Sequence, residues 1–289
     1  MAAAVIGKTR QEPAEIEESF DPALSKPRGV LQRPLPAAGK FRHARRSVAP
    51  DLMPWIDHYW MVSWDLRGLE PRIVESLPHP NVHLVFERGN SKVWGVPTTK
   101  FSRTLEGKSH VFGVKFTPGG FFPFLGCSLS SITNRSVTVN EVFSNVEALE
   151  DLVVSTENED EMMEASNAFF LARIPAADEK TALARQLVER ILQERDILTV
   201  DDLSGHAGIS VRSLQRLFSQ YVGVSPKWVI RRYRLHELLE RMHSGEQLDW
   251  AQLAAELGYF DQAHLINDFK SIVGYTPTEY PGLHANGES

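Results

Sequence analysis

The sequence predicts an α+β chain of two domains, with a β-rich N-terminal domain that has flanking helices and an all-α C-terminal domain. Three observations support this prediction. The length of 289 residues suits two domains better than one. Short segments rich in β-branched and aromatic residues, separated by Gly, Pro and Asn, fill the stretch from Trp55 to Leu125. From Thr181 onward, apolar residues recur at helical spacing.

The β-rich domain is predicted from four segments, HYWMVSWDL, NVHLVFERG, SKVWGV and HVFGVKF. Turn residues bound each of them, which is typical of antiparallel strands. The helical patterns NVEALEDLVV and ENEDEMMEASNAFFLARI follow. We therefore expect residues 41–174 to form a β-rich domain, cupin-like or related, with helices at its C-terminal end. Residues 1–40 are rich in proline and lack a sustained period, so we expect a mostly disordered tail there.

The C-terminal domain, expected at residues 181–285 after a linker at 175–180, contains an internal repeat. LSGHAGISVRSLQRLFSQYVGVSP (203–226) aligns with LAAELGYFDQAHLINDFKSIVGYTP (253–277). Leu and Gly match at an offset of 50, one residue is then inserted, and Leu, Phe, Gly and Ser/Thr-Pro match at an offset of 51. Two copies are too few for a solenoid, so they indicate a duplicated supersecondary unit.

Each copy has the pattern of a helix-turn-helix. Thr199 can cap a first helix, Gly208 can end it, and Ser210 can cap the next. In that second helix Leu214, Leu217 and Phe218 form one apolar stripe. A plain helical hairpin is the alternative, and the second copy disfavours it. We expect recognition helices at about 210–221 and 261–272, each suited to the major groove of DNA.

The charge is distributed unevenly along an acidic chain. The formal net charge is −6, yet residues 205–236 hold six arginines and lysines and no Asp or Glu. Such a segment is typical of phosphate contact. Residues 237–289 hold two basic residues against nine acidic ones, and Asp268 is expected to face outward and repel phosphate. We therefore expect the first copy to supply most of the affinity and the second to add modest sequence discrimination.

The fragments ISVRSLQRLFSQYVGVSPKWVIRRYRL and LAAELGYFDQAHLINDFKSIVGYTPTEY resemble the AraC/XylS family of transcription regulators. The resemblance covers about residues 181–285 and implies two helix-turn-helix units joined by a long helix, here at about 225–243. Asn267 stands where the family commonly has arginine, and Leu203-Ser204-Gly205 replaces the usual Leu-Ala-Ala. More weakly, FGVKFTPGGFFPFLG resembles the β-rich sensor domains of such regulators, which in relatives bind an effector or mediate dimerisation.

The expected function is sequence-specific DNA-binding transcriptional regulation, with a bipartite site read by two recognition helices and control by the N-terminal domain. The outward positions and the resemblance together give the residues expected to contact DNA: Arg212, Ser213, Gln215, Arg216, Ser219, Lys227, Arg231, Arg232, Gln262, Ala263, His264, Asn267 and Lys270.

The expected partner is double-stranded DNA. RNA polymerase, an unidentified small-molecule effector and a second copy of the chain, as a homodimer, are further candidates. No apolar run approaches the about 18 residues of a membrane-spanning helix, and a secretory signal pattern is missing, so we expect a cytoplasmic protein without membrane contact. Cys127, the single cysteine, lies among apolar residues and is expected to be buried and inert.

Two further readings concern the β-rich domain. His79 and His83, with Glu75 or His110, could hold a metal, but residues four apart on a strand stand well apart. We expect no metal, no cofactor, no catalytic residue and no enzyme. Aromatic residues could line an effector cavity, although core packing is commoner: Trp55, Trp60, Trp64, Trp94, Phe121, Phe122 and Phe124. Two alternatives stay open, an enzyme in the β-rich domain, metal-dependent or otherwise, and an interaction module that has lost DNA binding.

Overall fold

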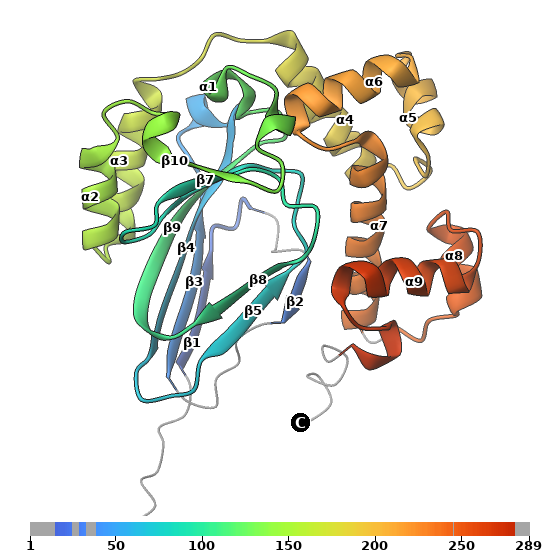
Figure 1. The fold of residues 1–289 in the computed structure, drawn as a ribbon, viewed down its shortest axis with the longest axis horizontal. Helices are drawn as coiled ribbons and strands as arrows, with labels where there is room; N and C mark the ends of the chain where they lie inside the picture. Colours follow the sequence, from blue (N-terminus) through green and yellow to red (C-terminus); the bar gives the residue numbers. More distant parts are fainter. Residues whose placement is uncertain (1–14, 25–28, 33–38, 245, 281–289) are drawn as a thin grey trace, which may run out of the picture.

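The chain forms a β-rich N-terminal domain beside a helical C-terminal domain, which confirms the predicted α+β class (Figure 1). This is a computed structural model, and it describes residues 15–24, 29–32, 39–244 and 246–280. Two β-sheets and the helices α2 and α3 make up the first domain. The second domain consists of helices joined by short turns.

The larger sheet has seven strands, antiparallel except where β1 pairs with β3 in parallel. The predicted strand segments form β4, β6, β7 and β9. In spatial order the strands are β1 (Glu15–Phe20), β3 (Lys40–Arg46), β4 (Ile56–Leu66), β9 (Gly107–Phe116), β6 (His83–Phe86), β7 (Lys92–Trp94) and β10 (Ser136–Thr138).

A smaller antiparallel sheet of β2 (Val30–Gln32), β5 (Arg72–Ser76) and β8 (Phe101–Leu105) accompanies the larger one. Strands β1 and β2 lie in the segment that we expected to be a disordered tail, so that prediction was wrong for residues 15–20 and 30–32. The acidic strand EIEESF lacks the apolar pattern of a buried strand, which is why the sequence did not reveal it. Residues 1–14 lie outside the described residues.

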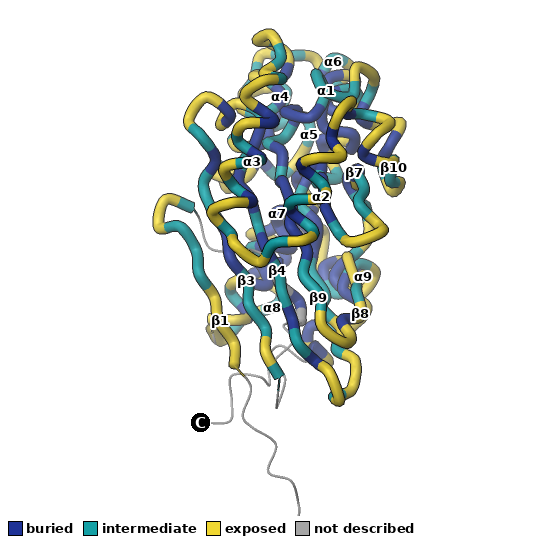
Figure 2. The backbone as a smooth tube through the Cα atoms, turned by 90° about the vertical axis from the view of Figure 1, so that its left-hand side faces the viewer, coloured by how far each residue is buried: buried dark blue, intermediate teal, exposed yellow. Residues whose placement is uncertain are grey.

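The faces of the larger sheet carry separate cores. Trp64, Val85 and Val111 pack with Leu105 of the smaller sheet in one cluster. On the other face, α2 (Glu147–Ser155) and α3 (Glu159–Leu171) pack over strands β4 and β9, as Figure 2 shows. The phenylalanines of TPGGFFPFLG, in and before α1 (Phe122–Leu125), belong to the packed cores, with Phe121 fully buried.

The helical domain begins at α4 and contains the predicted repeat. Its elements are α4 (Glu179–Gln193), α5 (Val200–Ala207), α6 (Val211–Leu217), a π-helical turn (Phe218–Val222), α7 (Pro226–His243), α8 (Trp250–Glu256) and α9 (Gln262–Val273). Within the described residues, no helix is long and apolar enough to cross a membrane.

The two domains share their hydrophobic cores. Val96 and Phe122 of the β-rich domain pack into the cluster around α4, α5 and α6. Leu31 and Leu77 pack into the cluster formed by α7, α8 and α9. The hydroxyl of Tyr280 also donates to the carbonyl of Leu31, with 2.6 Å between the oxygens. The β-rich domain therefore contacts both halves of the helical domain.

Candidate DNA interface

The first helix-turn-helix unit is built by local signals in α5, the turn and α6. Thr199 and Asp202 form a capping box at the start of α5. Gly208 ends α5 with φ of 64°, a left-handed conformation that glycine adopts without strain. Ser210 caps α6 by accepting a hydrogen bond from the backbone N–H of Ser213 at 3.3 Å. The predicted boundaries of this unit are confirmed.

The second unit repeats this construction. Asp249 caps α8. Gly258 lies in the following turn with φ of 75°. Asp261 then caps α9 by accepting a hydrogen bond from the backbone N–H of His264 at 2.7 Å. The predicted recognition helices therefore both exist and are both fixed at their N-terminal ends.

Buried leucine and phenylalanine side chains orient both recognition helices. Leu214 and Phe218 of the first unit are fully buried, and so are their counterparts Leu265 and Phe269 of the second. These side chains form the predicted stripe, so the opposite faces of α6 and α9 are left to solvent. The positions predicted to contact DNA that are exposed are Arg212, Gln215, Arg216, Ser219, Lys227, Arg231, Gln262, Ala263, His264, Asn267 and Lys270.

Two predicted contact residues are not fully exposed. Ser213 is half-buried, and its hydroxyl accepts a hydrogen bond from the hydroxyl of Ser210 at 3.0 Å. Arg232 is 2% exposed and faces the β-rich domain, where its guanidinium donates to the carbonyl of Thr98 at 2.8 Å. In this arrangement Arg232 cannot reach a phosphate. Arg234, which also belongs to the basic segment, is 4% exposed and donates to the carbonyl of Ile197 at 2.7 Å.

Asp268 is buried, which corrects the expectation that it faces outward and repels phosphate. Its carboxylate pairs with Arg231 of α7 and accepts a hydrogen bond from the Tyr259 hydroxyl at 2.7 Å. Burial, followed by the nearby Asp268 carboxylate, raises the pKa of Tyr259 well above its usual value. Asp268 therefore pairs with Arg231 inside the protein, and this pair joins α7 to α9.

Both recognition helices have their C-terminal ends against the β-rich domain. Beyond α6, the rings of Tyr221 and Phe122 lie 4.1 Å apart between centroids. Beyond α9, the ammonium of Lys100 lies 5.7 Å from the ring centroid of Tyr275. In Figure 1, α5 and α8 lie on the right, and α6 and α9 run from them toward the sheets. The N-terminal turns of both recognition helices, the part that contacts bases in helix-turn-helix proteins, therefore lie away from the β-rich domain.

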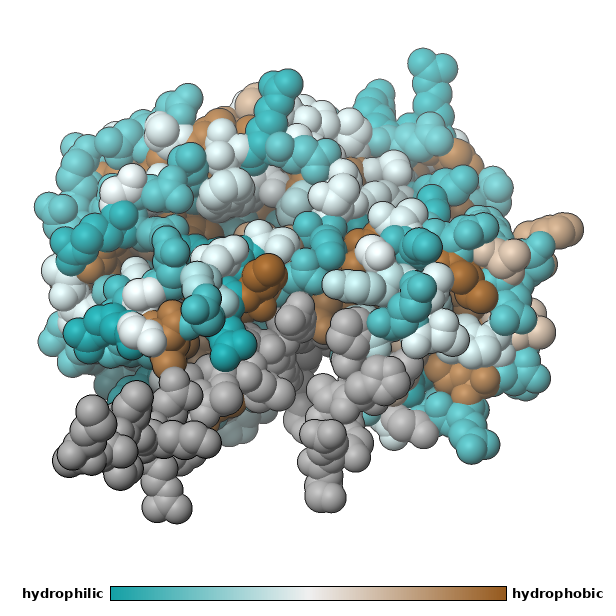
Figure 3. Space-filling model, turned by 60° about the horizontal axis from the view of Figure 1, so that its bottom comes forward, coloured by the Kyte–Doolittle hydropathy of each residue, from teal (hydrophilic) through white to brown (hydrophobic). Residues whose placement is uncertain are grey.

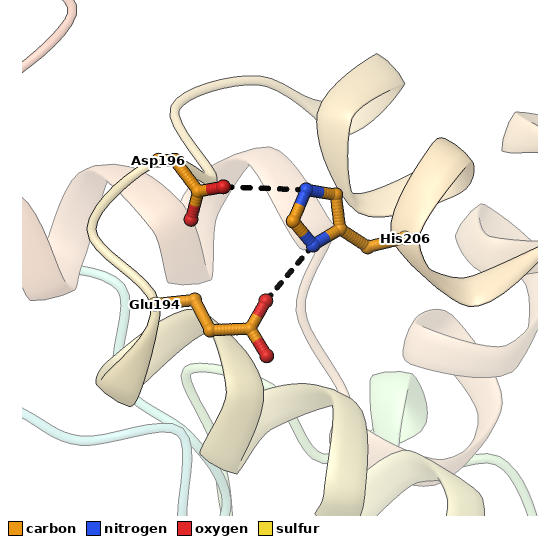
Figure 4. A group of neighbouring side chains, drawn as sticks. All are labelled: Glu194, Asp196 and His206. Atoms are coloured by element: carbon orange, nitrogen blue, oxygen red, sulfur yellow. Dashed lines mark hydrogen bonds and ion pairs between the residues drawn. The ribbon is translucent and has the colours of Figure 1, made fainter.

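A histidine between two carboxylates connects α5 to the end of α4 (Figure 4). The ring nitrogens of His206 lie 2.9 Å from a carboxylate oxygen of Glu194 and 3.4 Å from one of Asp196. Among the described residues, these three side chains are close enough together to hold a metal ion. Each carboxylate faces a different nitrogen of the ring. The group therefore links α5 to the end of α4 and to the loop that follows it.

The histidines considered as metal ligands, His79, His83 and His110, have separate partners. His79 packs against His236 of α7 with the rings tilted by 46° and 4.4 Å between their centroids. His83 accepts a hydrogen bond from the indole of Trp60 at 3.2 Å, whereas His110 bonds the carbonyl of Val153 at 3.0 Å. This separation gives the metal-enzyme alternative no support. The seven aromatic residues considered as a cavity lining are also dispersed, since Trp64 belongs to the core between the sheets and Trp94 is exposed.

Cys127 is exposed, contrary to the expectation that it is buried. It lies in the turn after α1, next to Ser128, whose hydroxyl donates to the carbonyl of Ser219 at 3.1 Å. The apolar residues before Cys127 in the sequence pack inward while the turn itself stays at the surface. Neighbours in sequence were therefore a poor guide to the burial of this thiol.

Comparison with protein families divides the chain in the same way as the structure. Residues 203–281 match a family described as a helix-turn-helix domain, and residues 45–138 match a domain of unknown function, DUF6597. The search of curated proteins gave no match. The first match spans α5 to α9 and so includes both units. The fold and this match assign these residues to a helix-turn-helix domain.

Solved structures similar to the chain include the following two. A transcriptional regulator of AraC type from Chromobacterium violaceum is 24% identical over 38% of this chain and 92% of that one, with a TM-score of 0.29. ToxT from Vibrio cholerae O395 is 16% identical over 86% of this chain and 99% of that one, with a TM-score of 0.37. Because both TM-scores are low, the assignment comes from the domain match and from the two units. The C-terminal domain is a helix-turn-helix domain that contains two units.

Proposed function

We propose that this chain is a sequence-specific transcriptional regulator that reads a bipartite DNA site through α6 and α9. The observation that carries the proposal is that both recognition helices are capped, point their N-terminal turns away from the β-rich domain and belong to units joined by the continuous helix α7. A recognition helix reads bases with its N-terminal residues. Two such helices on one subunit would read two half-sites in successive major grooves.

The first half-site receives most of the phosphate contact in this proposal. Arg212, Arg216 and Lys227 are exposed, and residues 205–236 include no Asp or Glu that would weaken their attraction to phosphate. Arginine and lysine neutralise phosphates and release bound counterions, which makes the affinity fall as salt rises. In the second unit, Gln262 and Asn267 are the exposed amides that could pair with adenine.

Control by the N-terminal domain is the second part of the proposal. Contacts from this domain reach the first unit at Gly223, the connecting helix at Arg232 and the second unit at Tyr280. A ligand or partner that shifts the β-rich domain would therefore change the placement of one recognition helix relative to the other. RNA polymerase, a small-molecule effector and a second copy of the chain stay candidate partners.

The test is selection of duplexes from a randomised pool by the full chain at two salt concentrations. We expect enrichment of a site with two separated half-sites and a steep loss of affinity at the higher salt. Arg216→Ala is expected to weaken this binding strongly. The matched control is Arg67→Ala, which removes the same charge from an exposed residue paired with Asp65 in the β-rich domain. Failure to enrich any duplex at low salt would instead favour an interaction module that has lost DNA binding.

A further inference from the structure

Phe260 is the most exposed of the large apolar side chains that the structure describes. Its exposed fraction is 93%, against 49% for the next, Met53 and Ile73. The lower face of the molecule in Figure 3 is mostly hydrophilic, with apolar groups scattered across it. A phenyl ring left almost completely in water gains nothing for the fold, because burial of apolar surface is what stabilises a folded chain. The ring is therefore accessible to a partner molecule.

Phe260 is the residue by which the two copies of the repeat differ in length. In the first copy, Gly208 is followed by the half-buried Ile209 and the cap Ser210. In the second copy, the buried Tyr259 and the cap Asp261 enclose one additional residue, Phe260. Tyr259 is held inside by its hydrogen bond to Asp268. The inserted residue must therefore point outward from the turn, just before the second recognition helix.

We propose that Phe260 is a specificity-determining residue whose ring contacts the 5-methyl group of a thymine in the half-site read by α9. This inference rests on the proposed function. Phe260 precedes Gln262, Ala263 and His264, the exposed residues of the first turn of α9, which is the part of a recognition helix that faces the bases. Of the base edges in the major groove, the thymine methyl group is the apolar one, and phenylalanine is among the side chains that contact it.

The charge of α9 supports an apolar contact at this point. From Asp261 to Phe269, the described helix carries no arginine or lysine, and the first lysine, Lys270, lies two turns further on. The first turn of α9 can therefore draw little binding from phosphate neutralisation. A methyl group removed from water by the phenyl ring gives the second unit a source of both affinity and base discrimination that does not depend on salt.

The test uses the full chain and a duplex from the selection described above. Each thymine of the second half-site is replaced in turn by deoxyuridine, which differs from thymine in the methyl group alone. At one position the wild-type protein is expected to bind about four-fold more weakly, the factor that corresponds to burying one methyl group. The variant Phe260→Ser is expected to bind the thymine and deoxyuridine duplexes equally, and Phe260→Leu to keep part of the difference.

Ile73→Ser, an exposed apolar residue of the β-rich domain, is the matched control and should behave as wild type. Thermal unfolding checks that Phe260→Ser leaves the fold intact, as its exposure predicts. An equal deoxyuridine effect in wild type and Phe260→Ser would overturn the assignment and leave the proposed function standing. Normal DNA binding by Phe260→Ser, with loss of transcription by RNA polymerase, would also overturn it, in favour of a protein contact. If no duplex is enriched, both proposals fail together.

Discussion

The guanidinium of Arg232 donates to the backbone carbonyl of Thr98, with 2.8 Å between Nη2 and the oxygen, and joins the connecting helix to the β-rich domain. The same guanidinium lies over the ring of Trp228, 4.8 Å from its centroid. Burial lowers the pKa of Arg232 to about 10, which still leaves it charged at neutral pH. Arg232 therefore lies within the basic segment 205–236 but forms a contact between the two domains.

Arg232 and Arg216 are expected to differ in their effect on the salt dependence of DNA binding. Arg216→Ala should reduce the slope of log affinity against log salt by about 0.9, the value for one lost phosphate contact. Arg232→Ala should leave that slope unchanged and lower the free energy of unfolding by about 1–2 kcal/mol, because the carbonyl of Thr98 would keep only the longer bond from the Trp228 indole and the buried side chain would be lost. Filter binding at several salt concentrations and urea unfolding measure the two effects. Equal reductions of the slope would contradict the interdomain role of Arg232.

Asp268→Ala is expected to destabilise the second unit by about 2 kcal/mol, because the buried hydroxyl of Tyr259 would lose its acceptor. Loss of the ion pair with Arg231 contributes less to this destabilisation, because the side chain of Arg231 is half exposed and can be solvated by water instead. Tyr259→Phe, which removes the donor instead, should cost less. Urea unfolding of the full chain compares the two variants. If Asp268 repelled phosphate instead, Asp268→Ala would bind DNA more tightly than wild type without loss of stability.

Protonation of His58 is expected to make the β-rich domain less stable in acid. The side chain is 3% exposed, and its Nε2 accepts a hydrogen bond from Nε of Arg45 at 2.9 Å, which requires the neutral ring. Burial lowers its pKa to about 4, against about 6.5 in the unfolded chain. Between these values the unfolded state binds the extra proton, so stability is complete above pH 6.5 and falls as the pH drops toward 4.

Between pH 6.5 and 4, protonation of His58 is expected to lower the free energy of unfolding by up to about 3 kcal/mol. His83, whose pKa burial lowers to about 3, acts in the same direction. His58→Gln should therefore flatten the decrease of the unfolding free energy between pH 6.5 and 4, although not abolish it. Urea unfolding at a series of pH values gives the slopes, and NMR titration of the imidazole gives the pKa directly. The same slope in wild type and His58→Gln would show that this ring is not the group that titrates.

The local parts of the fold could be predicted from the sequence, because caps, glycine turns and apolar spacing act within a few residues. The connecting helix was expected at 225–243 and spans Pro226–His243. Burial that depends on distant partners could not be predicted. Arg232 is buried by Thr98 and Asp268 by Arg231, contacts 134 and 37 residues apart in sequence. The same limit hid β1 and β2, whose pairing partners, and not their own residues, make them strands.

The matched glycines of the repeat give a test of the contact between the domains. Gly223 and Gly274 have nearly the same conformation, with φ of 91° and 93°, so alanine meets the same backbone strain of about 1 kcal/mol at each. A Cβ on Gly223 would lie 3.2 Å from both the carbonyl oxygen of Leu129 and Oγ1 of Thr133, in the β-rich domain. A Cβ on Gly274 would meet the ammonium end of Lys100 at 3.3 Å, and a lysine side chain can move away.

Gly223→Ala is therefore expected to lower the free energy of unfolding by at least about 1 kcal/mol more than Gly274→Ala. Both variants have the same backbone strain, but at Gly223 the neighbouring backbone of Leu129 must also shift. The hydrogen bond from Thr133 to the carbonyl of Gly223, 2.6 Å long, should weaken at the same time. Urea unfolding of the full chain measures both costs, and Thr133→Ser serves as a variant that keeps this hydroxyl. Equal decreases in the free energy of unfolding for the two glycine variants would mean that the β-rich domain can shift at this point without loss of stability. The first unit would then not be held in place through Leu129 and Thr133.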